Sequence, residues 1–382
     1  MPTIRFFGES PTYGGFGHMN YRNGRHFEDV VMADFEPLRA TNSVLVLDDP
    51  FQGLEARFNG RFTYANDGEV TSFRIDQITF FNNGERFQVW TDLGWTEDDL
   101  GPVIEAADNG DRDAFEDFLD SQVFRFILDD RATSPGVIAL TEQDDRFIGE
   151  AADPYDNGIS IFSYGGDDVI DLRARLETAY VDSGKGNDIV KLGDGFNQVR
   201  SGKGKDDIRG GAGEDNLDGE DGRDIVNGGA GDDVFLSGGR GNDIVRGGAG
   251  DDHINDERGT NRIFGGDGDD FITGRGFIAG GAGDDTMSSS ARGAVDTFDF
   301  RLRGDDGFGR DTIFGNFHIN SDAIDRVVFD EGVEIDHRVN ENSGRLVLEV
   351  SLDGEFIGRV GVSGAGFDNA TVTAFLNNIE FV

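Results

Sequence analysis

The chain has no cysteine, only 7 prolines and no apolar run near the length of about 18 residues that spans a bilayer. Without cysteine, neither a disulfide framework nor a thiolate zinc site can form. Basic residues are also scarce: 34 Lys and Arg stand against 75 Asp and Glu, for a formal charge of −41. This balance excludes binding to nucleic acid or to an anionic membrane through net charge. The first residues also lack the apolar stretch of a cleavable signal peptide.

Glycine and phenylalanine are abundant, with 58 and 33 copies in 382 residues. An apolar share of 36% is enough for a packed core, and the length suggests two or three domains. A folded protein of charge −41 repels itself unless counter-ions neutralise the carboxylates. Bound divalent cations are therefore the first expectation.

Residues 183–287 repeat with a nine-residue period. Successive units read SGKGNDIVK, LGDGFNQVR, SGKGKDDIR, GGAGEDNLD, GEDGRDIVN, GGAGDDVFL, GGRGNDIVR, GGAGDDHIN, DERGTNRIF, GGDGDDFIT and GGAGDDTMS. One residue, Ser237, is inserted, a shortened unit spans 274–279, and an outlying copy lies at 164–170. The pattern is G-G-x-G-x-D-x-U-x, the calcium-binding β-roll nonapeptide.

Each unit is interpreted as a six-residue turn followed by a three-residue strand with an apolar middle residue. These apolar residues are expected to point inward: Val190, Val199, Ile208, Leu217, Val226, Phe235, Val245, Ile254, Ile263, Ile272 and Met287. Two units form one coil of about 18 residues, so units two apart stack on the same edge. Glycine in the turns permits backbone conformations and close approaches that a Cβ would block. Turn carbonyls and position-6 carboxylates can then surround a cation, and hard oxygen ligands select Ca²⁺.

The predicted cofactor is thus Ca²⁺ in several copies, held along two edges. The first edge carries Asn197, Asp215, Asp233, Asp252, Asp270 and Asp285, and the second carries Asp188, Asp206, Asp224, Asp243 and Asn261, with Asp168 upstream. The predicted turn glycines are Gly211, Gly213, Gly229, Gly231, Gly248, Gly250, Gly266, Gly268, Gly281 and Gly283. We expect the first edge to be the fuller ladder, and the second to be weaker at Asn261.

Position 3 of the turns distinguishes the edges. The second edge has Lys185, Lys203, Asp221, Arg240 and Arg258 there, whereas the first has mainly alanine. One interpretation is contact with an anionic polysaccharide or a cell surface. The other is that these cations neutralise neighbouring acids. The sequence leaves both open.

The repeat units resemble those of the RTX (repeats-in-toxin) family of secreted calcium-binding proteins. The resemblance implies a parallel β-roll, export by the type I secretion machinery, a secreted or cell-surface location and folding after export. The C-terminal region, residues 289–382, adds to the resemblance, because segments 295–300 and 307–317 resemble those that close RTX rolls. The final acidic-then-hydrophobic residues resemble the tail of type I substrates. Departures from the repeat are Asn197, Asn261 and the poor turn 256–260.

Three domains are expected: a β-rich N-terminal domain (1–150), the roll (160–288) and a β-rich C-terminal cap with the secretion segment (289–382). Strands are predicted at 43–47, 61–64, 70–75, 77–81 and 86–90, with turns at Asn59-Gly60, Asp67-Gly68 and Asn83-Gly84. A capping box at Thr96 predicts one helix, and 111–120 a second. Further strands at 345–351 and 356–362 make the chain all-β dominated.

No catalytic residue is predicted. H-E-x-x-H and G-x-S-x-G are both absent, and every glycine cluster belongs to the nonapeptide. Trp90 and Trp95 suit either sugar stacking or a core. The favoured hypothesis is a non-enzymatic calcium-folded protein of surface association, matrix or a cell-envelope layer. The alternative is an extracellular polysaccharide hydrolase or lyase with its site in the N-terminal domain. Neither the partner nor the oligomeric state follows from the sequence.

Overall fold

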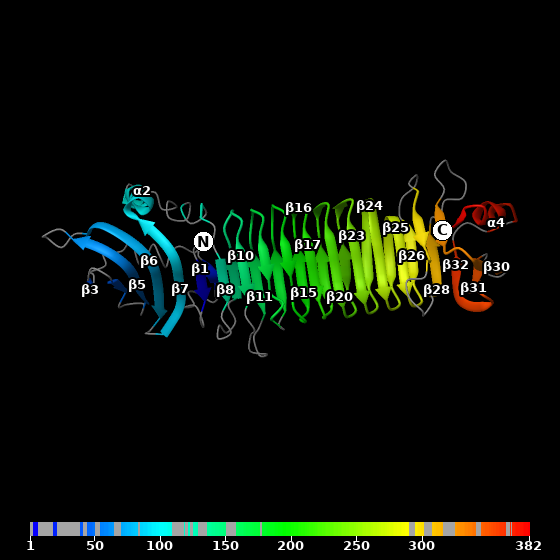
Figure 1. Cartoon of the computed structure of the whole chain (residues 1–382), viewed down its shortest axis with the longest axis horizontal. Helices are drawn as coiled ribbons and strands as arrows, with labels where there is room; N and C mark the ends of the chain where they lie inside the picture. The colour runs from blue at the N-terminus through cyan, green and yellow to red at the C-terminus, as the bar shows by residue number, and fades with distance from the viewer. Residues whose placement is uncertain are drawn as a thin grey trace. The chain divides into compact units, whose positions relative to one another are not determined.

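The computed structural model gives the chain as two compact units, Met1–Gly193 and Asp194–Val382, and each is described by itself (Figure 1). The described residues are 3–6, 18–20, 39–40, 44–49, 54–64, 70–82, 85–108, 118, 121–122, 125–128, 136–149, 158–175, 178–289, 295–301, 308–315, 325–340, 345–363, 367 and 369–382. Within them, no helix is long and apolar enough to cross a membrane.

The first unit begins with an antiparallel sheet. Its strands are β1 (Thr3–Phe6), β3 (Arg39–Ala40), β4 (Val44–Asp49), β5 (Leu54–Tyr64), β6 (Val70–Asn82) and β7 (Glu85–Thr96). β3 to β7 pair antiparallel in chain order, and β7 also pairs antiparallel with β1. β2 (His18–Asn20) instead belongs to a column of parallel strands. The strands predicted at 70–75 and 77–81 form one strand, β6. Of the two roles that the sequence leaves open for Trp90 and Trp95, the structure supports a place in the core. Both side chains are buried, and their rings pack edge to face.

The turn predicted at Asn59-Gly60 is wrong. These residues lie inside β5, where the register with β6 shifts between them. Gly60 is needed there because a Cβ would overlap the main-chain oxygen of Arg74. The pair therefore lies opposite a bulge in β6, where Asp76 is the extra residue. The pairs at 67–68 and 83–84 lie outside the described residues, although Asn82 pairs with Glu85 across the second of them.

Helix α2 (Glu97–Asp108) follows β7 directly. Its start is fixed by Thr96, whose main-chain amide and hydroxyl both donate to Oδ2 of Asp99 at 2.8 Å. The bond from the amide is one half of the capping box that the sequence predicts. The second predicted helix, 111–120, lies almost entirely outside the described residues.

Parallel stacking begins within the first unit. β8 (Arg125–Leu128), β10 (Arg146–Gly149), β12 (Val169–Asp171) and β14 (Ile189–Lys191) form one column. β2, β9 (Gly136–Ala139), β11 (Ile159–Phe162) and β13 (Ala179–Asp182) form another. Each strand presents alternate residues to the interior, so Phe147, Ile161, Ile170, Val181 and Val190 are fully buried.

The second unit contains two such columns, seen as parallel arrows in Figure 1. One column holds β15 (Asn197–Arg200), β18 (Asp215–Asp218), β21 (Phe235–Ser237), the first parts of β24 (His253–Asp267) and β25 (Phe271–Ala282), β26 (Thr286–Ser289) and β28 (Gly309–Gly315). The other holds β17 (Asp207–Gly211), β20 (Ile225–Ala230), β23 (Ile244–Ala249), the second parts of β24 and β25, β27 (Thr297–Asp299) and β29 (Arg326–Phe329). Short strands β16 (Lys203–Gly204), β19 (Asp221–Gly222) and β22 (Arg240–Gly241) pair within the turns.

The core of this unit is one apolar side chain per strand, as predicted, with one exception. Leu217 pairs with Leu236, and Phe235 pairs with the outward-facing Asn216. Leu236 is therefore fully buried, and Phe235 is only half-buried. The extra residue of this unit therefore precedes the inward-facing residue, whereas the sequence analysis placed it after that residue, at Ser237. Parallel β-solenoid coils are thus present between residues 159 and 298, and the predicted β-roll is confirmed.

The end of the chain adds an antiparallel ribbon of β30 (Val333–Asn340), β31 (Arg345–Leu352) and β32 (Glu355–Val362). β32 continues one column by pairing parallel to β28, and β33 (Ile379–Phe381) continues the other by pairing with β29. Helix α4 (Asn369–Leu376) lies between them in sequence. The strands predicted at 345–351 and 356–362 are present. Of the two, β32 pairs with β28, whose edge would otherwise be open, and β31 pairs with β30 and β32.

Candidate calcium-binding turns

The position-6 carboxylates of the roll are all buried. Each follows a glycine-rich turn and directly precedes, or begins, a strand. Asp168, Asp188, Asp206, Asp215, Asp224, Asp233, Asp243, Asp252, Asp270 and Asp285 are all at most 2% exposed, as are Asn197 and Asn261. Such carboxylates are almost never buried without a compensating partner.

One oxygen of each carboxylate is held by the main chain of the turn stacked before it. On the first edge, the amide of Asp215 donates to Oδ1 of Asp233, and the amide of Asp233 to Oδ1 of Asp252, both at 2.9 Å. The same bond recurs from Asn197 to Asp215, from Asp252 to Asp270 and from Asp270 to Asp285. On the second edge it links Asp206 to Asp224, Asp224 to Asp243 and Asp243 to Asn261. In the first unit it links Asp145 to Asp168 and Asp168 to Asp188. The bonds fix every carboxylate in one orientation along the stack.

The other oxygen is buried and has no hydrogen-bond partner. This holds for Oδ2 of Asp215, Asp224, Asp233, Asp243, Asp252, Asp270 and Asp285. A buried orphan acceptor costs about 1–3 kcal/mol, and more when it is charged. A whole row of such atoms in a native fold needs an explanation, and a bound ion is one that fits.

The glycines form a cradle around these oxygens. A Cβ at Gly228, at position 1 of its turn, would overlap Oδ2 of Asp233. A Cβ at Gly229 would overlap the carbonyl oxygen of Gly211, and the φ of +123° at Gly229 also favours glycine. The same clashes recur in the turns that begin at Gly247, Gly265 and Gly280. Carboxylate and carbonyl oxygens therefore converge where the repeat demands glycine.

Burial changes the acidity of the row. It raises the pKa of Asp233 and Asp270 to about 8, that of Asp215, Asp224 and Asp285 to about 7, and that of Asp252 to about 6. Neighbouring carboxylates add to the shift at Asp233, where Asp252 and Asp215 both contribute. Main-chain amides partly oppose it. Near neutral pH the row is thus costly to ionise unless a cation enters.

The donor set suits calcium rather than a transition metal. Among the described residues, no three His, Asp or Glu side chains form a ready-made metal cluster. Turn carbonyls would therefore supply much of any coordination shell, next to one or two carboxylates. Calcium accepts six to eight oxygen ligands of this mixed kind in flexible geometry. The residues present fit the ion.

Asparagine alters two turns. Nδ2 of Asn197 donates to the carbonyl oxygen of Gly195 at 2.8 Å and to Oδ1 of Asp215 at 2.9 Å. Nδ2 of Asn261 donates to the carbonyl oxygens of Asp256 at 3.0 Å and Arg258 at 3.2 Å. In both turns the amide nitrogen meets oxygens of the kind that would ligate a cation. These two amide nitrogens therefore occupy positions from which they satisfy those oxygens.

A buried acid absent from the prediction lies beside Asn261. Asp256 occupies position 1, where the repeat has glycine, and its side chain is buried with no hydrogen-bond partner of good geometry for either oxygen. Burial raises the pKa of Asp256 to about 8, and the nearby Asp243 adds to the shift. The departure from glycine was visible in the sequence, but the inward direction of the side chain was not.

The ladders also extend beyond the predicted array. The amide of Asp285 donates to Oδ1 of Asp311 at 2.9 Å, and the amide of Asp296 donates to Oδ1 of Asp325 at 3.0 Å. Asp145 plays the matching donor role upstream. The five residues before Asp325 contain no glycine, and Asp311 follows Gly307 and Gly309 but lies after the end of the regular array, so neither was predicted. The signal that remained was Asp-x-apolar, as in Asp311-Thr-Ile313 and Asp325-Arg-Val327.

The basic residues at position 3 form an exposed column of a different kind. Lys203, Asp221, Arg240 and Arg258 pair in register along the second edge. Nη1 of Arg240 lies 2.9 Å from Oδ1 of Asp221, and both side chains are exposed. This contact agrees with neutralisation of neighbouring acid, the second interpretation of this column. An exposed pair of this kind adds little stability.

The nonapeptide units of this chain match a known family of repeats. The family described as RTX calcium-binding nonapeptide repeat (4 copies) matches residues 200–235, 237–272, 256–287 and 277–291. No curated protein is a significant match. Among solved structures, the chain is similar to the crystal structure of extracellular lipase LipA from Serratia marcescens, with 14% identity over 86% of this chain and 81% of that chain. The TM-score of 0.26 is too low for that likeness to carry an argument. Residues 200–291 are RTX calcium-binding nonapeptide repeats, and repeats of this kind bind several calcium ions.

Proposed function

We propose that the position-6 carboxylates hold the calcium ions together with the carbonyl oxygens of the stacked turns, and that these ions fold the roll. The observation that carries this is the row of buried Oδ2 atoms without partners, from Asp215 to Asp285. The proposed ligands are Asp168, Asp188, Asp206, Asp215, Asp224, Asp233, Asp243, Asp252, Asp270 and Asp285. Asn197 and Asn261, whose amide nitrogens occupy ligand directions, mark the weaker turns.

Folding is proposed to take place outside the cell, after export by a type I machine. Without metal, the stacked carboxylates repel one another. One apolar side chain per short strand makes a thin core, whose burial offsets little of the conformational entropy that the chain loses on folding. At tenfold excess over its dissociation constant, a bound ion stabilises the fold by about 1.4 kcal/mol per site. Millimolar extracellular calcium reaches this range for sites of about 10⁻⁴ M, and cytosolic calcium does not. The chain would then be unfolded during export and rigid afterwards.

The role of the folded protein is proposed to be non-enzymatic surface association, in a matrix or a cell-envelope layer. The burial of Trp90 and Trp95 supports this role, because it removes the aromatic platform that a sugar-cleaving N-terminal site would use. The two rows of buried carboxylates also support the role of a calcium-dependent scaffold, since these acids are inaccessible to a substrate.

Limited proteolysis across a calcium series tests the proposal. The full chain would be digested at calcium levels from below 1 µM to about 2 mM, and the fragments mapped by mass spectrometry. We expect residues 183–287 to be cleaved in low calcium and protected in millimolar calcium. Protection equal at both levels would overturn calcium-driven folding. Release of new reducing ends from polysaccharide by the calcium-loaded chain would overturn the non-enzymatic role.

A further inference from the structure

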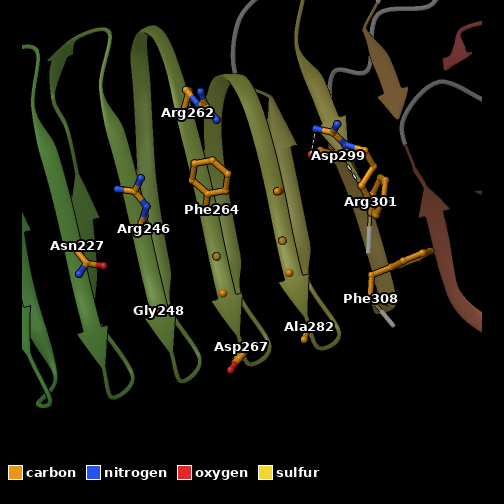
Figure 2. Close-up of a pocket in the computed structure, with 16 residues that line it drawn as sticks. Asn227, Arg246, Gly248, Arg262, Phe264, Asp267, Ala282, Asp299, Arg301 and Phe308 are labelled. Atoms are coloured by element: carbon orange, nitrogen blue, oxygen red, sulfur yellow. Dashed lines mark hydrogen bonds and ion pairs between the residues drawn. The ribbon is translucent and has the colours of Figure 1, made fainter. Parts of the chain in front are cut away.

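A hollow of about 560 Å³ lies over the second column of strands in the second unit (Figure 2). Asn227, Arg246 and Phe264 come from neighbouring strands β20, β23 and β24 and form one row of outward side chains. The row ends at Ala279 of β25, which pairs with Phe264. Beyond Phe264 the side chains shrink to alanine and glycine, and this step opens the hollow.

The floor and far wall are of different chemistry. Gly265, Gly266, Gly280 and Gly281 leave main chain exposed to the hollow as its floor. Figure 2 shows Arg301, Asp299 and Phe308 on the other side. Arg301 is held there by two hydrogen bonds to the buried Asp299, at 2.8 and 2.9 Å. The volume is within the range of about 300–1,000 Å³ that is typical of ligand sites.

Two arginines on the near wall are stacked on phenylalanine. The guanidinium carbon of Arg246 lies 5.7 Å from the ring centre of Phe264, and that of Arg262 lies 5.6 Å from the same centre. Arg262 also lies 5.7 Å from the ring centre of Phe277. Stacking of this kind positions a planar guanidinium before any ligand arrives, so less freedom is lost on binding.

These two arginines differ from the arginines of the roll that pair with an acid two residues earlier in the chain. Arg209 forms an ion pair at 2.8 Å with Asp207, two residues earlier on its strand, and Arg173 does so with Asp171. At the hollow the residue two positions before Arg246 is Ile244. Within the described part of the chain, no carboxylate forms an ion pair with Arg246 or Arg262. Among the described residues, exposed Arg200 also has no ion pair, so Arg246 and Arg262 are distinguished by their position beside phenylalanine rings at the edge of the hollow.

We propose that this hollow binds an oligosaccharide whose rings carry carboxylate or sulfate groups. Arg246 and Arg262 would bind the oxyanions through their planar forks. Asn227 and Arg301 would donate to ring hydroxyls or further oxyanions. Attraction is local, because charge is screened over about 8 Å at physiological salt. The site is separate from the exposed column of Lys203 and Arg240. This inference rests on the proposed function, since calcium must neutralise the nearby carboxylate ladders before an anion can bind.

Calorimetric titration of the full calcium-loaded chain tests the site. The probes are tri-galacturonate and a sulfated trisaccharide, with maltotriose as the neutral control. We expect at least one acidic probe to bind in the micromolar to millimolar range and maltotriose not to bind. The two probes distinguish a carboxylate site from a sulfate site. Absence of binding by both acidic probes would overturn the proposal.

Variants locate the binding. Arg246→Ala with Arg262→Ala should weaken the acidic probe at least tenfold, and Arg246→Lys with Arg262→Lys should weaken it less. The matched control is Arg200→Ala, an exposed arginine of β15 in the other column. Equal loss in the control, or no loss in the double alanine variant, would contradict the site. Calcium stoichiometry is measured on every variant: a wild-type chain that binds no calcium refutes the proposed function, whereas intact calcium binding without saccharide binding refutes this inference alone.

Discussion

The main-chain amide of Asp215 donates to Oδ1 of Asp233 at 2.9 Å, while Oδ2 of Asp233 is buried against Gly228 with no hydrogen-bond partner. One oxygen is thus used to align the stack, and the other is left for a cation. The relationship repeats along both edges of the second unit, so a change in one carboxylate affects two stacked turns.

The first prediction concerns these carboxylates. Asp233→Asn should remove one or two bound calcium ions and lower the stability of the calcium-loaded chain by about 1.4 kcal/mol per lost site. Asp232→Asn is the matched control, because Asp232 is the neighbouring acid in the same turn but is exposed. Calorimetric stoichiometry and thermal unfolding in millimolar calcium measure both effects. Equal losses in the two variants would show that general charge, and not the buried ladder, holds the metal.

The second prediction concerns the cradle. Gly228→Ala places a Cβ on Oδ2 of Asp233, so the turn must shift and should lose both calcium affinity and about 2–3 kcal/mol of stability. Gly101→Ala in α2 meets no atom within 4 Å and should stabilise its helix by about 0.5–1 kcal/mol. Chemical unfolding in calcium gives both values. The cradle explanation fails if Gly228→Ala is as harmless as the helix variant.

The third prediction is a gain of binding. In Asn197→Asp, the amide nitrogen that now donates to Gly195 and Asp215 is replaced by a carboxylate oxygen. Calcium should then bind in this turn, and the stoichiometry should rise by one ion. Asn242→Asp is the control, since Asn242 is exposed and lies at position 5 of another turn. An unchanged ion count in Asn197→Asp, measured by calorimetry, would argue against the amide as a substitute for the ion.

The fourth prediction follows from acidity. Burial raises the pKa of Asp252 to about 6 and that of Asp233 to about 8 in the calcium-free fold, against 3.8 for the ordinary side chain. The folded state therefore binds more protons than the unfolded state, so this contribution to stability is complete below about pH 4 and is lost as pH rises through about 6 to 8. Calcium replaces the protons, and its apparent affinity should rise over the same interval.

Titrations at pH 6, 7, 8 and 9 check this, with proton release measured in two buffers of different ionisation enthalpy. At pH 6 protonation of the buried carboxylates favours the fold even without calcium, so we expect protons to be released on binding; at pH 9 the calcium-free chain is a coil with ionised carboxylates, and we expect few. Calcium affinity that is constant from pH 6 to 9 would mean that the buried carboxylates do not exchange protons for the ion.

Much of the roll was predictable, because a nine-residue period with one apolar residue per unit determines both the strand and the face it buries. The prediction failed where the period is interrupted. At 234–236 the extra residue enters before the inward position, so Leu236 and not Phe235 fills the core. A period cannot tell on which side of a strand an insertion is absorbed.

The site was predictable only where glycine marks the turn. Asp311 and Asp325 continue the ladders by the same hydrogen bonds, but Asp311 lies outside the regular array and the turn before Asp325 contains no glycine. Asp256 and the hollow beside Arg246 depend on which way side chains point and on what the next coil places beside them. Those contacts come from stacking across coils, which spacing along the chain does not determine.

The most direct test of calcium-driven folding is a calcium titration of chelator-treated protein, followed by far-UV circular dichroism and calorimetry on the same sample. The account predicts a transition from coil to β-structure at sub-millimolar calcium, with several ions bound and a weaker class where asparagine replaces aspartate. A chain that is already folded in chelator and binds no calcium would contradict it.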